Sequence, residues 1–146
     1  MQTIWIVIKN YQYSLPFELK KMMKELTKAE EQVMQILWQL KEAIVKQILE
    51  KMPDDPKPAY NTVSTVVRVL ESKGFVDHKA YGNSHVYFPI VSEEEYKKFA
   101  FDKVIKSYFN NSYKSLVSYL VKEQKLNLSE LAELILLAER SRNKEK

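Results

Sequence analysis

The sequence predicts a mainly α-helical fold with one small β-hairpin. After residue 26, apolar residues recur at intervals of three and four in successive stretches, which is the period of an amphipathic helix. Residues 75–80 and 85–90 are instead strand-like runs, and the sequence YGNS between them has the composition of a hairpin turn. Helices therefore flank a single hairpin on both sides.

The composition excludes several classes of function. A chain of 146 residues with 45% hydrophobic content can bury a core, as one domain or two small ones. The absence of Cys excludes disulfides, thiolate zinc sites and thiol redox sensing. Only His78 and His85 could supply metal-binding nitrogens, so we expect no metal site and no cofactor. The net charge of +4 and the pI of 9.1 favour an anionic partner such as nucleic acid.

Residues 1–21 are interpreted separately, as an N-terminal extension of uncertain structure. The apolar run MQTIWIVI ends at Lys9 and Asn10, far short of the roughly 20 apolar residues that a membrane span needs. The basic region and cleavage site of a signal peptide are missing. Three readings of the segment stay open: a strand, a disordered lead, or the product of an upstream start codon. We expect a cytoplasmic protein without membrane insertion.

Two helices are predicted between residues 22 and 53. Thr27 and Glu30 form a T-x-x-E capping box, which satisfies free amide donors at a helix start. The apolar face that follows consists of Val33, Ile36, Leu37 and Leu40. A second, shorter apolar period ends at Pro53, whose ring disfavours helical geometry in the preceding residue.

In residues 59–73, propensity and periodicity conflict. The stretch is rich in Val and Thr, which suit a strand, but Val63, Val67 and Leu70 lie at helical spacing. β-Branched residues lower helix propensity by only a few tenths of a kcal/mol each, whereas burying a Val or Leu returns roughly 1.5 to 3 kcal/mol. Pro58 suits a first helical turn, and Gly74 suits a helix C-terminus. We therefore expect a helix over residues 59–73.

The opposite face of this helix carries short hydrogen-bonding side chains and one Arg. A helix in the DNA major groove needs such small donors and acceptors, because its backbone must approach the base edges closely. Three helices followed by a hairpin make a winged helix-turn-helix domain, here residues 22–91. We expect base contacts from Asn61, Thr62 and Thr65. We expect DNA backbone contacts from Tyr60, Ser64, Arg68, Lys73, Lys79, Tyr81, Asn83, Ser84 and His85.

Simpler interpretations of the same residues stay open. The polar face of the helix over residues 59–73 could be an exposed surface without a partner. Likewise, His78 and His85 could be hairpin residues with no special role.

Residues 92–146 are predicted to form three helices and a charged tail. Ser92 and Glu95 form a second capping box, and further helices start at Ser112 and near Ser129. Roughly fifty residues are few for a stable monomeric core, so we expect a homodimerisation domain. The expected interface residues are Tyr96, Phe99, Val104, Ile105, Tyr108, Phe109, Leu116, Val117, Leu120, Leu131, Leu134 and Ile135. In the alternative, these helices pack on the winged domain of the same chain.

Two stretches resemble a known family. LTKAEEQVMQILW and AYNTVSTVVRVLESKGFVDHKAYGNSHVYFPIVS are similar to the penicillinase and methicillin-resistance repressors of the BlaI/MecI type, which include copper-responsive CopY-like members. The resemblance covers about residues 24–142. It implies a homodimeric transcriptional repressor, not an enzyme, that binds a dyad operator in double-stranded DNA with half-sites containing TACA and TGTA.

The release mechanism departs from the family pattern. The copper-responsive branch uses a Cys-rich tail, and this chain has no Cys. In the β-lactam-responsive branch, a membrane metalloprotease sensor is activated and an Asn-Phe bond in the first dimerisation helix is then cut. No Asn-Phe pair occurs here, and Lys103 and Val104 align with that bond. The resemblance implies proteolytic release in a β-lactam- or stress-responsive system, with that sensor or its downstream protease as a partner.

The alternative function is a winged-helix protein-interaction module without sequence-specific DNA binding, because the fold alone does not decide function. A protein-binding helix would be expected to expose more aromatic and aliphatic anchors than residues 59–73 provide. An enzyme is not expected. The sequence contains no Ser, His and acid arrangement and no phosphate-binding Gly loop, and it has only two Gly in total.

Overall fold

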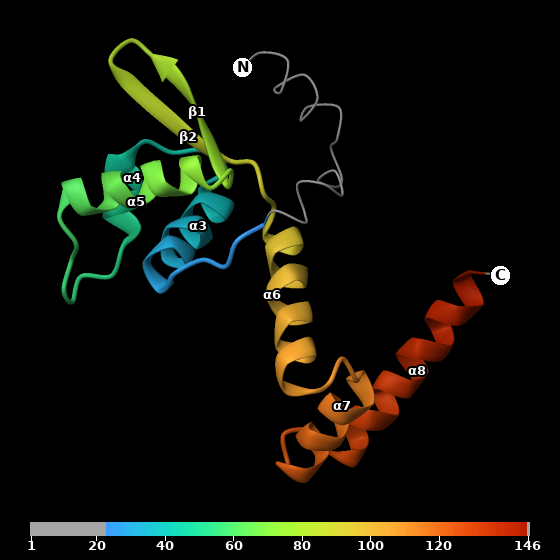
Figure 1. The fold of residues 1–146 in the computed structure, drawn as a ribbon. Helices are drawn as coiled ribbons and strands as arrows, with labels where there is room; N and C mark the ends of the chain where they lie inside the picture. The colour runs from blue at the N-terminus through green and yellow to red at the C-terminus, as the bar shows by residue number, and fades with distance from the viewer. Residues whose placement is uncertain (1–22, 146) are drawn as a thin grey trace. The chain divides into compact units, whose positions relative to one another are not determined.

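The computed structural model describes residues 23–145, and these divide into two compact units on either side of the boundary between Ala100 and Phe101. The predicted extension at residues 1–21 lies outside the described residues. Mainly helical structure with one hairpin is confirmed (Figure 1). The elements are α3 (Lys28–Leu40), α4 (Val45–Lys51), α5 (Tyr60–Ser72), β1 (Val76–Tyr81), β2 (Ser84–Pro89), α6 (Glu93–Tyr108), α7 (Tyr113–Lys122) and α8 (Leu128–Lys144). We predicted a domain boundary at residues 91/92, and the division between the units falls inside α6.

The residues that predicted helix ends from the sequence lie at the start of α3 and at both ends of α5. The Thr27 amide donates to Glu30 Oε2 at 3.0 Å, and the Glu30 amide donates to Thr27 Oγ1 at 3.3 Å, so both halves of the capping box are formed. The stretch at 59–73 is helical, as its period predicted, and Pro58 precedes the N-cap residue, Ala59. Gly74 has φ +81°, the left-handed geometry that ends a helix.

Strands β1 and β2 form an antiparallel hairpin with Gly82 and Asn83 as its turn. Gly82 has φ +58°, which a residue without a Cβ adopts readily. The base of this wing is tied down by Ala43, whose amide donates to the Tyr87 carbonyl at 2.9 Å and whose carbonyl accepts from the Tyr87 amide at 2.8 Å. The wing is thereby anchored to the segment between α3 and α4.

The winged unit has a closed hydrophobic core, to which all three of its first helices contribute. Its fully buried side chains are Val33, Met34, Leu37, Ile48, Val63, Val67, Leu70, Phe75 and Val76. The first turns of α6 belong to this core as well. The Tyr96 hydroxyl accepts a hydrogen bond from the Leu26 amide at 3.1 Å, and its ring lies 5.8 Å from that of Phe75. Phe99 packs against the same core, so neither Tyr96 nor Phe99 is exposed as expected for a dimer contact.

The C-terminal unit contains the end of α6 together with α7 and α8. Ile105 is fully buried, yet no residue of α7 or α8 is buried. The predicted start of α7 at Ser112 is confirmed, since its hydroxyl caps the Ser115 amide. Helix α8 starts at Leu128, within one residue of the predicted start near Ser129, and Asn127 provides its cap through a reciprocal pair of bonds with Glu130. Across residues 23–145, no helix has the length and apolar content needed to cross a membrane.

Candidate nucleic-acid interface

Helix α5 has an apolar face and, on the opposite side, a polar face. Val63, Val67 and Leu70 are buried in the core, and this burial fixes which side of the helix faces outward. The expected base-contacting residues Asn61, Thr62 and Thr65 are all exposed on the other side. The helix therefore presents a polar surface that packing holds in a fixed orientation.

Two side-chain bonds organise this polar face. The Thr65 hydroxyl donates to the Asn61 carbonyl at 2.8 Å, an interaction that Thr commonly makes one turn back along a helix. It leaves the Thr65 methyl group available for an outside contact. The Arg68 guanidinium donates from Nη2 to Ser64 Oγ at 3.2 Å, which directs a cation along the exposed face.

A polar groove of about 440 Å³ brings α5 and the wing together. Of the expected backbone-contacting residues, those lining it are Tyr60, Ser64, Arg68, Asn83, Ser84 and His85. Lys46, in the first turn of α4, also lines it and did not figure in our sequence prediction. An exposed cation at the start of the helix before α5 was the signal that could have found it. Two cations thus converge on one concave surface.

Lys73 has a different environment from the one we expected. Its Nζ lies 2.7 Å from Glu30 Oε2, and the two side chains are only 22% and 8% exposed. Burial of Glu30 raises the pKa of its carboxyl, but hydrogen bonds from Lys73 and from the Thr27 amide outweigh burial, so the pKa is lowered overall. Lys73 therefore joins the end of α5 to the start of α3 and does not line the groove.

The wing has two different faces, because side chains alternate along each strand. His78 lies opposite Tyr87 in the hairpin register, and His85 follows on the same face. Lys79 lies on the other face, where its Nζ is 5.3 Å from the centre of the Phe88 ring. Tyr81, at the tip, is exposed. The expected wing contacts are thus divided: His85 lines the groove, and Lys79 lies on the outer face.

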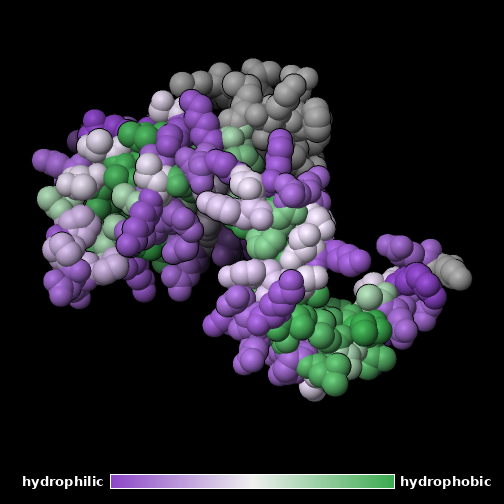
Figure 2. Space-filling model, turned by 60° about the horizontal axis from the view of Figure 1, so that its bottom comes forward, coloured by the Kyte–Doolittle hydropathy of each residue, from purple (hydrophilic) through white to green (hydrophobic). Residues whose placement is uncertain are grey.

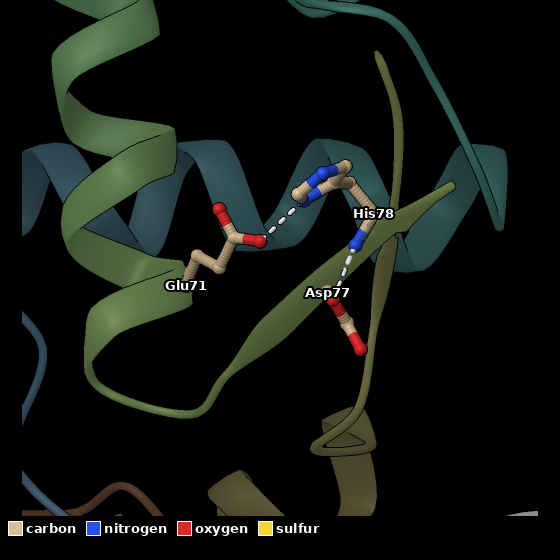
Figure 3. Close-up of side chains that lie close together, drawn as sticks. All are labelled: Glu71, Asp77 and His78. Atoms are coloured by element: carbon tan, nitrogen blue, oxygen red, sulfur yellow. Dashed lines mark hydrogen bonds and ion pairs between the residues drawn. The ribbon is translucent and has the colours of Figure 1, made fainter. Parts of the chain in front are cut away.

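Glu71, Asp77 and His78 form a cluster where α5 meets the wing (Figure 3). Their possible metal-ligand atoms lie within 4.8 Å of one another. Each is already used inside the cluster: His78 Nδ1 bonds to Glu71 Oε1, and Asp77 Oδ1 accepts from the His78 amide at 2.8 Å. A structural zinc site takes four ligands, so this arrangement favours a link between two elements over a metal centre.

Tyr87 lies on the side of the wing that lines the groove. It is buried, and burial raises the pKa of its hydroxyl above the usual value of 10.0, with the nearby Glu71 carboxylate adding to the increase. The hydroxyl is therefore neutral at physiological pH. The positive charge of the groove comes from Lys46 and Arg68.

Comparisons with known proteins identify the family. The sequence model of the family described as penicillinase repressor matches residues 26–140. The methicillin resistance regulatory protein MecI of Staphylococcus aureus strain N315 is 29% identical over 110 residues, which cover 75% of this chain and 89% of that protein. The penicillinase repressor of Bacillus licheniformis is 22% identical over 126 residues, covering 86% and 98%.

Among solved structures, the Bacillus licheniformis BlaI monomeric form in complex with the blaP half-operator is similar. It has 23% sequence identity and a TM-score of 0.44, and the match covers 51% of this chain and 90% of that chain. The family match spans most of the sequence, from the start of α3 into the last helix. The chain therefore belongs to the penicillinase repressor family, whose members are transcriptional repressors and not enzymes.

Proposed function

We propose that the chain is a homodimeric transcriptional repressor that binds a dyad operator in double-stranded DNA, in the cytoplasm, through α5 and the wing. The observation that carries the proposal is the groove in which the polar face of α5, the wing tip and two cations meet. Family membership supports it, since the family is described as penicillinase repressor and the Bacillus licheniformis relative is named a penicillinase repressor. The modest net charge of +4 is compatible with a polyanionic partner.

In this proposal, base reading and backbone positioning fall to different residues. Asn61 is suited to a bidentate contact with adenine, and the Thr62 and Thr65 methyl groups are suited to thymine. The residues around the groove, together with the exposed Tyr81, contact phosphates and set the register. We add Lys46 to the residues proposed to contact phosphates, and we remove Lys73 from them because it forms an ion pair with Glu30.

Dimerisation is proposed through the apolar surface of the C-terminal unit (Figure 2). A groove of about 590 Å³ on α8 is lined largely by Leu, with Glu130, Glu133 and Arg140 beside them. Exposed apolar surfaces of this kind mark interaction sites, and a twofold dimer covers the same surface on both copies. The exposed large apolar residues of this unit are Phe101, Val104, Tyr108, Tyr113, Val117, Tyr119, Val121, Leu128, Leu134, Ile135, Leu136 and Leu137.

The proposed interface differs from the one expected from sequence in several residues. Tyr96 and Phe99 are in the winged core, and Ile105 is buried within its own unit. The others, Val104, Tyr108, Phe109, Leu116, Val117, Leu120, Leu131, Leu134 and Ile135, are exposed or half-buried. Twofold symmetry then presents two copies of α5 to one face of the duplex, with half-sites about 10 bp apart or a multiple of that.

Release by proteolysis is proposed within α6, by a membrane metalloprotease sensor or its downstream protease in a β-lactam- or stress-responsive system. Lys103 and Val104 are exposed there, and a cut between them would separate the winged unit from the helices that dimerise. Dimer loss would remove the benefit of binding two half-sites at once. Incubation with extracts of induced cells should yield fragments that end in α6. An intact α6 after induction would count against this route.

DNA binding itself is tested with the DNA upstream of the chain's own gene and its neighbours, inspected for an inverted repeat. In a gel shift, the full chain should bind this DNA far more tightly than random DNA of equal length. The alternative, a winged-helix protein-interaction module, predicts no preference between the two. Equal and weak binding would therefore overturn the repressor proposal.

A further inference from the structure

We propose that Glu71 and His78 are positioning residues that hold the wing at a fixed angle to α5, so that the wing tip is already in place when it meets DNA. The inference rests on the proposed function and deepens it. It assigns a role in DNA binding to two side chains that are not themselves placed against DNA.

The pair joins the two elements that form the groove. Glu71 lies in the last turn of α5 and His78 in β1, and His78 Nδ1 contacts Glu71 Oε1 (Figure 3). An ionised carboxylate only accepts hydrogen bonds, so Nδ1 carries the proton in this contact. Both side chains are only about a third exposed, at 29% and 32%, which limits competition from water.

The imidazole ring of His78 also contacts the second strand of the hairpin. Its ring stacks on the His85 ring at 4.3 Å between centroids with an angle of 13° between planes. His85 belongs to β2 and lines the groove. The Asp77 carboxylate additionally holds the His78 amide. Glu71 therefore fixes His78, and His78 fixes the strand that leads to the wing tip.

A hairpin needs such support because two strands alone are marginally stable in water. The bridge between Ala43 and Tyr87 anchors the base of the wing. Residues 80–85 at the tip are all exposed, so their position depends on contacts nearer the base. Without the contact between Glu71 and His78, the wing tip samples more orientations. Fixing it in one orientation on DNA then costs conformational entropy, which weakens binding.

The experiment is a double-mutant cycle on operator affinity, measured by fluorescence anisotropy with the full chain. His78→Phe removes the donor but keeps a ring against His85, and it should weaken operator binding roughly three- to tenfold. Asn83→Ala removes a proposed contact at the wing tip. In the Asn83→Ala background, His78→Phe should have a smaller effect than in the wild type, because one of the contacts that the pair positions is already lost.

Two matched controls separate positioning from general damage. Paired with Asn61→Ala on α5, His78→Phe should retain its full effect, since that base contact does not depend on the wing. His78→Asn retains an N–H donor close to the position of Nδ1 but loses the ring against His85, so it should bind more tightly than His78→Phe and less tightly than the wild type. The thermal midpoint of each variant shows whether the winged unit is still folded.

The outcomes are distinguishable. Wild-type chain that does not prefer operator DNA contradicts the proposed function itself. Operator binding with additive effects of His78→Phe and Asn83→Ala overturns the positioning role alone. His78→Asn as weak as His78→Phe, with both variants folded, also overturns it.

Discussion

The two units use similar amphipathic helices in different ways. In the winged unit, α3, α4 and α5 each bury apolar side chains in a core closed by the chain itself, and Leu37 and Val67 have no exposed surface. In the C-terminal unit, α7 and α8 have no buried residue, and Leu128 is 83% exposed. An apolar face on a helix thus predicts that this face is buried. It does not predict whether the residues that bury it come from the same chain.

The exposed surfaces of the two units differ in polarity. The winged unit exposes a polar face on α5 beside Arg68 and Lys46, which suits phosphates and base edges. The C-terminal unit exposes Leu and Ile side chains, which suit another apolar surface. This difference supports the proposals that the first unit binds DNA and that the other binds a second copy of the chain.

Breaking the proposed dimer should have the largest effect. Leu137 is 60% exposed, so Leu137→Glu places a charge in the proposed interface with little effect on the fold of one chain. We expect the mass in sedimentation equilibrium to fall from dimer to monomer. Operator affinity should fall by roughly a hundredfold or more, because the second half-site no longer adds to binding.

The matched control for Leu137→Glu is Lys98→Glu, which introduces the same side chain at an exposed position of the winged unit. It should leave the sedimentation mass unchanged. A Leu137→Glu chain that sediments as a dimer would contradict the assignment of this surface to a second copy.

The same Leu to Ala change in each unit sharpens the comparison. Leu37→Ala removes fully buried methyl groups and should lower the free energy of unfolding by about 2–5 kcal/mol. Leu128→Ala should change it by about 0.5 kcal/mol or less at concentrations where the chain is monomeric. Urea unfolding at several protein concentrations measures both, since a stability linked to dimerisation depends on concentration. Equal losses in the dilute monomer would show that the C-terminal helices are buried within their own chain.

A smaller effect distinguishes stabilising cations from DNA-binding ones within the winged unit. Lys73→Met should lower the free energy of unfolding by roughly 1–2 kcal/mol at pH 7, and should change operator affinity by less than about twofold. The folded-state pKa of Glu30 is lowered, so its contribution is present above the ordinary value of 4.5 and is lost as the pH falls through the lowered pKa.

Lys73→Met removes the hydrogen bond and the charge of Lys73, which include the largest cause of that lowering. Unfolding free energies measured from pH 7 down to about pH 3 should therefore fall less steeply for Lys73→Met than for the wild type. A tenfold loss of operator affinity with unchanged stability would instead restore Lys73 as a phosphate contact.

Local signals account for the part of the fold that the sequence could predict. The capping pairs at Thr27 and Ser92 lie three residues apart and act within one turn, and both are formed. The period of α5 is similarly local, and burial of its Val residues outweighed their strand preference. The start of α8 was predicted to within one residue, but its cap, Asn127, was not identified.

Contacts between elements could not be predicted in this way. Lys73 and Glu30 are 43 residues apart, and Tyr96 and Leu26 are 70 apart. Nothing in either local sequence shows which partner the fold provides. Lys73 therefore suggested a phosphate contact, whereas it pairs with Glu30. Tyr96 suggested a dimer contact, whereas it packs in the core of the winged unit. The bond between Glu71 and His78 was missed for the same reason.

The central claim is that α5 reads DNA sequence, and the most direct test is the ratio of operator to random DNA affinity for Asn61→Ala. We expect this ratio to fall roughly tenfold or more, since a bidentate base contact contributes on the order of 1–3 kcal/mol of discrimination. Arg68→Ala is the control: it should weaken binding to both DNAs alike and lower the salt dependence by about one phosphate contact. An Asn61→Ala chain that binds with an unchanged ratio would contradict the account.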